Sequence, residues 1–168
     1  METFLIRALQ LIASLSILIV IHEFGHFLFA RLSGTRVERF YLFFNPGFSL
    51  MRFKKVNGKI EFDFLSKNEP EHWKNYPEST VWGLGWLPLG GYCSISGMVD
   101  ETQSLEDLAA EPQPWEFRTK KPFPRLMIMA GGVLFNFILA LTLYSMILGI
   151  WGKSYLPVQN VPLGMDFS

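Results

Sequence analysis

Cysteine is almost absent from this chain of 168 residues, which contains only Cys93. A single cysteine excludes a disulfide within the chain and a metal centre built from several thiolates, and we expect Cys93 to pack as a small apolar side chain. The chain also lacks a surplus of either charge, because 15 Lys and Arg residues balance 15 Asp and Glu residues. This balance gives no indication of a nucleic-acid partner, for which a basic patch is typical.

Charged residues are nearly missing from two long apolar stretches, Phe4–Ala30 and Leu126–Trp151. Each exceeds the roughly 20 apolar residues that a helix needs to cross a bilayer. A cleaved signal peptide is the alternative for the first stretch. It fits poorly, because the run is too long and its start, with Glu2 and Arg7, carries no net positive charge. We therefore predict an α-helical membrane protein with two transmembrane helices.

The basic residues predict an orientation for these helices. Of the 15 Lys and Arg residues, 13 lie between Arg31 and Arg125, and only Arg7 and Lys153 lie elsewhere. Loops rich in Lys and Arg next to the span ends stay on the cytoplasmic side. We expect residues 31–125 to be cytoplasmic and both termini to be extracytoplasmic.

Ionisable residues gather at the end of the first apolar stretch, in the sequence His22-Glu23-Phe24-Gly25-His26. Such residues are rare in a membrane and mark functional sites there. On a helix, His22 and His26 share one face and can bind one zinc ion, while Glu23 can take a proton from water as a general base. The alternatives are a chance match on a solvated helix and a buried His–Glu pair without metal. The apolar surroundings disfavour both.

The segment between the spans has the composition of β-strands. Val37–Phe44 and Thr80–Leu87 are rich in aromatic and β-branched residues, and the chain stays strand-like as far as Ile95. Asn57-Gly58 separates two further strand candidates and is a strong hairpin signal. We predict a membrane-associated β-sheet or hairpin insert between the two transmembrane helices. An ordinary cytoplasmic β-layer is the alternative that the pattern leaves open.

The second strand of the predicted hairpin alternates between apolar and acidic residues. We expect one buried face and one hydrated face, the first formed by Ile60, Phe62 and Phe64 and the second by Glu61 and Asp63. The third histidine of the chain, His72, lies in the polar segment 66–79. We predict a surface position without a partner for His72.

The second apolar stretch contains small or polar residues at Gly132, Asn136 and Ala140, which share one helix face. Such a stripe lets another helix approach closely. Asn136 has two interpretations: a hydrogen bond between helices, or a position facing the metal site, where it would bind the substrate carbonyl or oxyanion.

These patterns divide the chain into five predicted segments. They are a first transmembrane helix with the zinc motif (1–31), a membrane-associated β region (32–98), a cytoplasmic or interfacial connection (99–125), a second transmembrane helix (126–152) and the start of an extracytoplasmic region (153–168).

Several separate motifs resemble those of the site-2 protease family of intramembrane zinc metalloproteases, specifically the bacterial regulator-of-sigma-E protease group. Phe117, Lys120 and Arg125 match the spacing that precedes the second helix of that group. Val133 stands where the family usually has proline, so the kink that proline would produce is not expected here. The motifs themselves are His22–Phe27, Gly34–Phe40, Pro88–Tyr92 and Gly132–Asn136.

The resemblance implies a zinc-dependent protease of the bacterial inner membrane that acts in regulated intramembrane proteolysis. Its partners would be membrane lipid and single-pass transmembrane proteins, whose transmembrane segments it hydrolyses. An exposed edge of the sheet within Val37–Leu65 would hold the unwound substrate by strand addition. A catalytically inactive membrane scaffold and a zinc-binding membrane protein are the alternative functions.

The family also has features that this sequence does not contain. Its third zinc ligand is an aspartate from a later transmembrane helix, and PDZ domains lie between the two halves. We therefore expect the 168 residues to be the N-terminal portion of a longer protease that lacks activity alone, with the aspartate and the PDZ region beyond Ser168.

Overall fold

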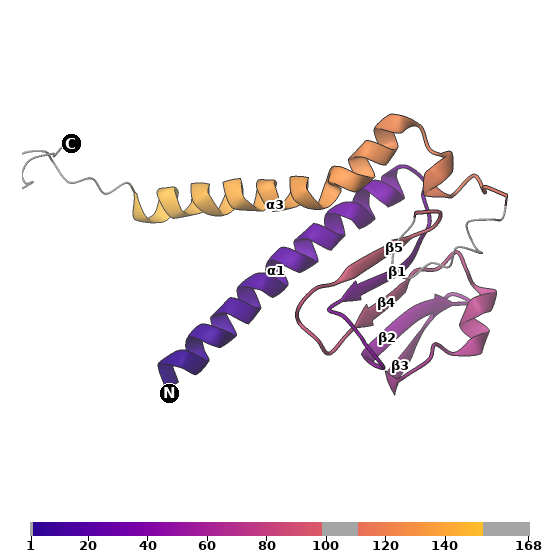
Figure 1. Cartoon of the computed structure of the whole chain (residues 1–168), viewed down its shortest axis with the longest axis horizontal. Helices are drawn as coiled ribbons and strands as arrows, with labels where there is room; N and C mark the ends of the chain where they lie inside the picture. Colours follow the sequence, from indigo (N-terminus) through magenta and orange to yellow (C-terminus); the bar gives the residue numbers. More distant parts are fainter. Residues whose placement is uncertain (1, 99–110, 153–168) are drawn as a thin grey trace, which may run out of the picture. The chain divides into compact units, whose positions relative to one another are not determined.

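A computed structural model describes residues 2–98 and 111–152 (Figure 1). The chain divides into a unit of residues 1–136, which contains the first helix, the sheet and the start of the last helix, and a unit of residues 137–168, in which that helix continues. The predicted segment 153–168 and residues 99–110 of the predicted connection lie outside the described residues. The elements are α1 (Glu2–Leu32), β1 (Val37–Leu42), β2 (Ser49–Val56), β3 (Lys59–Ser66), η1 (Glu71–Asn75), β4 (Val81–Leu84), β5 (Tyr92–Ile95), η2 (Phe117–Thr119) and α3 (Pro122–Trp151).

The two helices α1 and α3 match the two predicted spans. Both are 30 residues or longer and are apolar enough to cross a membrane by length and composition. α1 ends where Gly34 adopts a positive φ of 66°, a conformation that glycine takes without steric cost. α3 begins four residues before the predicted start, at Pro122, since proline is well tolerated in the first turn of a helix. Two long apolar helices flanking a small sheet confirm the predicted arrangement of elements.

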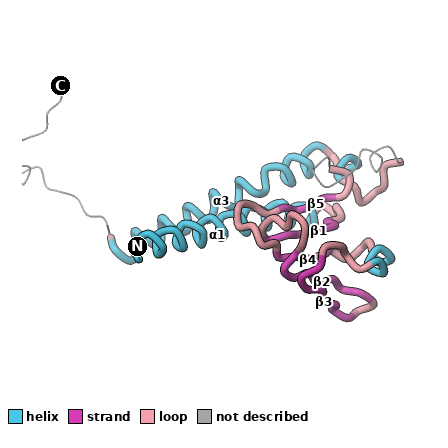
Figure 2. The backbone as a smooth tube through the Cα atoms, turned by 60° about the horizontal axis from the view of Figure 1, so that its bottom comes forward, coloured by secondary structure: helices cyan, strands magenta, loops and turns pink. Residues whose placement is uncertain are grey.

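The five strands form one sheet in the order β3-β2-β4-β1-β5. β1 and β4 are parallel, and the other neighbours are antiparallel. Asn57 and Gly58 connect β2 and β3 with φ angles of 51° and 81°, as a two-residue hairpin turn requires, so the predicted hairpin is confirmed. Figures 1 and 2 show β5 and β1 beside α1, with β3 at the far edge of the sheet.

One face of the sheet carries a row of apolar side chains that the strand register places side by side: Cys93, Phe40, Trp82, Phe53 and Phe62. Phe27 of α1 covers the near end of this row, with its ring centroid 5.5 Å from that of Phe40 and 5.0 Å from that of Trp82. Beyond α1 the face is open, and the apolar side chains of β3 are exposed.

The expected burial of β3 is therefore wrong. Ile60, Phe62 and Phe64 are 57–61% exposed, whereas Glu61 and Asp63 are half-buried. The polar face is the covered one, because segment 67–79 folds over it and packs Trp73 against the sheet. The alternation correctly separates two faces, but it carries no information on which face a distant segment covers.

Ion pairs and hydrogen bonds compensate part of the charge on the covered face. The guanidinium of Arg52, which is 3% exposed, pairs with Asp63 at 2.9 Å and donates to the carbonyl of Asn68 at 2.7 Å. A buried cation is tolerated when such partners satisfy it. The neighbouring cation on this face, Lys54, donates to the carbonyl of Trp73 at 2.9 Å.

Candidate metal centre

The two histidines of the zinc motif face each other across one turn of α1. The Nε2 atoms of His22 and His26 are 3.2 Å apart. Two ligands on a tetrahedral zinc ion with bonds of about 2.0–2.1 Å would be about 3.3 Å apart, so the pair has the separation that zinc requires. The predicted convergence of the two side chains is therefore present in the fold.

A hydrogen bond to the other helix fixes the ring of His26. Its Nδ1 donates to the carbonyl oxygen of Ile128 in α3 at 2.7 Å. With the proton on Nδ1, the lone pair of Nε2 is available for a metal ion. A bond from the second ring nitrogen to a carbonyl is the usual way in which proteins orient a metal-binding histidine.

Glycines let α1 and α3 meet backbone to backbone beside this pair. A Cβ atom placed on Gly25 would overlap the backbone of Gly131. A Cβ atom on Gly132 would lie 2.5 Å from Nε2 of both His22 and His26. Gly132 thus keeps open the space into which both nitrogens point, and the predicted close approach at this stripe is confirmed there. The sequence did not indicate that Gly25 contributes to this close approach, because Gly25 occupies a variable position of the zinc motif.

Glu23 lies on the side of α1 that faces the end of the sheet. Its carboxylate hydrogen-bonds with the backbone of Cys93 and is close enough to His26 to interact with it electrostatically. A Cβ atom on Gly91 would lie 3.4 Å from Cγ of Glu23 and 2.6 Å from the carbonyl oxygen of Tyr41. The segment before β5 therefore needs glycine to pass between α1 and β1. This contact explains why Gly91 is glycine, whereas a Cβ atom on Gly90 would overlap the ring of Phe44.

Asn136 of α3 lies at the same site. Its Nδ2 is 3.3 Å from Nδ1 of His22, while its Oδ1 is buried without a hydrogen-bond partner in the described part of the chain. Rotating the amide by 180° exchanges the two atoms. Oδ1 then accepts the proton of His22 Nδ1, and Nε2 of His22 becomes free for a metal. The carboxamide thus fits the site best as an acceptor from His22.

The described residues contain no group of three or more His, Cys, Asp and Glu side chains that could hold a metal ion. The third histidine, His72, lies in η1 with its side chain 57% exposed, as predicted for a surface residue. The expectation that it has no partner is wrong, because its Nε2 is 2.6 Å from the carboxylate of Glu61. Strand β3 brings Glu61 to His72 from 11 residues earlier, which the local sequence could not indicate.

Comparison with known proteins gives a consistent assignment. The chain matches the model of peptidase family M50 over residues 10–65 and 69–166. It is 28% identical to zinc metalloprotease Rip1 of Mycolicibacterium smegmatis over 80% of this chain and 27% of that protein. Candidate zinc metalloproteases of Ralstonia nicotianae and Helicobacter pylori are 29% and 32% identical to it, over 94% and 86% of this chain. The chain spans about a third of the length of these relatives, with shares of 30%, 27% and 34%.

Proposed function

The chain belongs to peptidase family M50, the site-2 proteases, and from this premise we propose that it hydrolyses peptide bonds within the transmembrane segments of single-pass membrane proteins. The observation that carries the proposal is the pair of Nε2 atoms 3.2 Å apart beside Gly132. Regulated intramembrane proteolysis is the setting that fits this activity. Neither alternative function, an inactive scaffold or a zinc-binding membrane protein, would need Glu23 as a general base.

His22 and His26 would hold the zinc ion through Nε2. When bound, zinc acts as a Lewis acid that polarises the peptide carbonyl and lowers the pKa of water. A catalytic zinc site has three protein ligands, so these two histidines need one more. We expect an aspartate from a further transmembrane helix, as the family resemblance implies.

Glu23 would act as the general base. Its carboxylate takes a proton from the attacking water and delivers it to the nitrogen of the leaving amine, so that the carboxylate is restored after each cycle. The hydrogen bond to the backbone of Cys93 holds the carboxylate at the end of the sheet. The peptide bond to be cleaved would have to lie near both this carboxylate and the two Nε2 atoms.

Asn136 would position His22. A carboxamide oxygen that accepts from Nδ1 fixes both the tautomer and the ring orientation of a metal-binding histidine. In this arrangement Oδ1 is occupied, while Nδ2 remains free to donate. The second role that the sequence suggested for Asn136, binding of the substrate carbonyl or oxyanion, would have to use that amide hydrogen.

The edge predicted for strand addition does not suit this site. The exposed edge within Val37–Leu65 is β3, and three strands separate it from β5. With neighbouring strands about 4.8 Å apart, β3 lies roughly 19 Å from β5, next to which Glu23 is found. A peptide paired with β3 would therefore lie far from the general base.

The exposed apolar face of the sheet favours a position in the membrane. The side chains of Ile60, Phe62 and Phe64, which are 57–61% exposed, would be costly in water but suit hydrocarbon. Because Lys and Arg residues beside membrane spans usually stay in the cytoplasm, the sheet would enter a bacterial inner membrane from the cytoplasmic side. Irregular backbone at that depth is tolerated where protein buries it.

Metal analysis tests the proposal. We expect the full-length protein to bind one zinc ion per chain and the double variant His22→Ala/His26→Ala to bind none. His72→Ala is the matched control, because it removes the remaining histidine, which lies on the surface away from α1, and should leave the zinc content unchanged. Full zinc content in the double variant would refute the assignment.

A further inference from the structure

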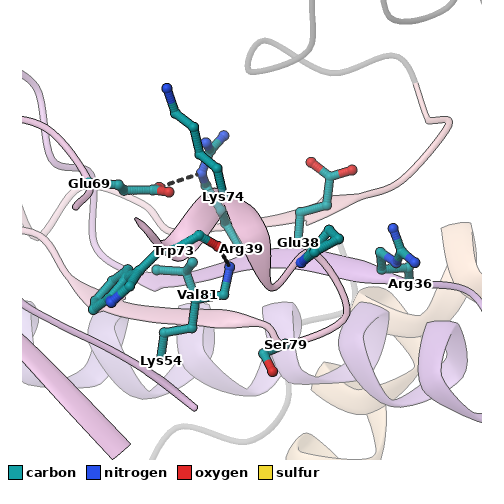
Figure 3. Close-up of a pocket in the computed structure, with 10 residues that line it drawn as sticks. Arg36, Glu38, Arg39, Lys54, Glu69, Trp73, Lys74, Ser79 and Val81 are labelled. Carbon is teal, nitrogen blue, oxygen red and sulfur yellow. Dashed lines mark hydrogen bonds and ion pairs between the residues drawn. The ribbon is translucent and has the colours of Figure 1, made fainter. Parts of the chain in front are cut away.

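A charged cavity lies on the covered face of the sheet, between β1, β4 and segment 67–79 (Figure 3). Its volume is about 270 Å³, and part of its wall is apolar, formed by Trp73, Pro77 and Val81. The charged part has four cations and two carboxylates, which leaves a surplus of two positive charges. These side chains are Arg36, Arg39, Lys54, Lys74, Glu38 and Glu69.

Lys54 is the buried cation of this cavity. Only 5% of the residue is exposed, and its ammonium group donates to the carbonyl of Trp73 (Figure 3). No carboxylate among the described residues lies within ion-pair distance of it. Burial lowers the pKa of Lys54, and the carboxylates of Glu69 and Glu38 oppose this effect only in part. An anion in the cavity would supply the missing charge.

The carboxylates of the wall act on Lys54 only from beyond ion-pair distance. Glu69 is engaged by Arg39, whose Nε lies 2.7 Å from its carboxylate. Glu38 forms no ion pair in the described parts of the chain, and three cations of the wall, Arg36, Lys54 and Lys74, also lack a carboxylate within ion-pair distance. One of these, Arg36, is held in place by the ring of Trp115, whose centroid lies 4.4 Å from its guanidinium carbon. A cation that is fixed in this way is prepared to bind an anion.

The cavity lies at the level where α1 ends and α3 begins. Lys120, just before α3, donates to the carbonyl of Gly34, just after α1, at 2.9 Å, and Trp115 hydrogen-bonds to the backbone of Arg36. Basic residues and tryptophans gather at the boundary between hydrocarbon and water. If the two helices span a membrane, phospholipid headgroups surround this level.

We propose that the cavity binds the phosphate group of an anionic phospholipid headgroup. The buried ammonium of Lys54 and the stacked guanidinium of Arg36 hold the phosphate oxygens, and Lys74 contacts the headgroup from the open side. The apolar wall accommodates the glycerol carbons. The proposal rests on the membrane position of the helices but not on protease activity, because no group of the metal centre takes part.

Calorimetry on the purified chain in neutral detergent tests this site. The probes are dioctanoylphosphatidylglycerol, dioctanoylphosphatidylcholine and inorganic phosphate. We expect saturable binding of the phosphatidylglycerol and roughly tenfold weaker binding after Lys54→Met, the loss of about 1.4 kcal/mol. Lys59→Met is the matched control, since it makes the same change at an exposed lysine of β3 outside the cavity.

Arg36→Gln provides a second variant in case Lys54→Met does not fold, and it should also weaken binding roughly tenfold. Equal affinities of the wild type, Lys54→Met and Arg36→Gln would overturn the proposal. Equal affinity for the phosphatidylcholine would also overturn it, because the site would then not select the anionic lipid. Displacement of the phosphatidylglycerol by an equal concentration of inorganic phosphate would identify a site for free phosphate and refute the lipid assignment.

Discussion

At the scale of single residues, the role proposed for Asn136 is to fix the tautomer and ring orientation of His22 for metal binding. We expect Asn136→Ala to weaken zinc binding by about 10–100-fold, the usual effect of losing an outer partner of a metal ligand. Asn136→Asp should retain most of the affinity, because a carboxylate oxygen can also accept from Nδ1. Competition with a chromophoric chelator measures the affinity.

Thr142→Ala, a change at an exposed polar residue of α3, is the control for Asn136 and should not alter zinc affinity. If Asn136→Asp retains zinc affinity and Asn136→Ala does not, the effect comes from the lost hydrogen-bond acceptor for His22 and not from altered packing of the helices. Equal affinities of Asn136→Ala and wild type would show that His22 needs no such partner.

Gly132 allows a second test of the same centre. We expect Gly132→Ala to reduce zinc binding strongly, because the added methyl group would lie 2.5 Å from both Nε2 atoms. Gly149→Ala is the matched control, since a Cβ atom there would meet nothing within 4 Å, and the same helix should tolerate it. Zinc content, measured beside the helicity of each variant, checks this expectation. Full zinc content in Gly132→Ala would mean that the metal does not occupy this space.

Glu23 should separate zinc binding from cleavage. We expect Glu23→Gln to lower the rate of cleavage by at least about 10²–10⁴-fold, the usual contribution of a general base, with normal zinc content. Cleavage of a single-pass substrate by the full-length protein in detergent is the assay. Loss of zinc from this variant would instead indicate that Glu23 is a ligand.

At the scale of elements, the helices and strands followed from the sequence because their signals are local. The apolar runs gave α1 and α3, and Asn57-Gly58 gave the β2–β3 hairpin. The face of β3 that is covered could not be predicted, because segment 67–79 reaches it from outside the hairpin. The histidine pair was predictable from its spacing, whereas its contacts with Ile128 and Asn136 depend on a helix about 100 residues away.

The open apolar face of the sheet predicts its depth in the membrane. In a Cys93→Ser background, a spin label at Phe64→Cys should be accessible to oxygen dissolved in lipid, since Phe64 is 61% exposed on this face. A label at Asn57→Cys, in the turn at the other end of β3, should be accessible to a water-soluble relaxation agent and, in intact cells, protected from outside reagents. Equal accessibility of the two positions to the water-soluble agent would favour an ordinary cytoplasmic β-layer.

At the scale of the whole molecule, the two histidines that the described residues bring together are one ligand short of the three that a catalytic zinc site has. We expect residues 1–168 alone to bind zinc more weakly than the full-length protein and to lack protease activity, because two neutral imidazoles leave the charge of the ion uncompensated. Chelator competition and a cleavage assay on both proteins in the same detergent measure the two quantities. Cleavage by residues 1–168 at the rate of the full-length protein would place the third ligand within them.

The crossing of α1 and α3 at Gly25 and Gly131 limits how this sequence can vary. Where two side chains touch, a change on one helix can be offset by a smaller residue on the other, but here backbone meets backbone and no smaller residue exists. We therefore expect libraries of variants to accept only glycine at these two positions, singly or in combination. At nearby exposed positions such as Val133 and Leu134 almost any apolar residue should be accepted.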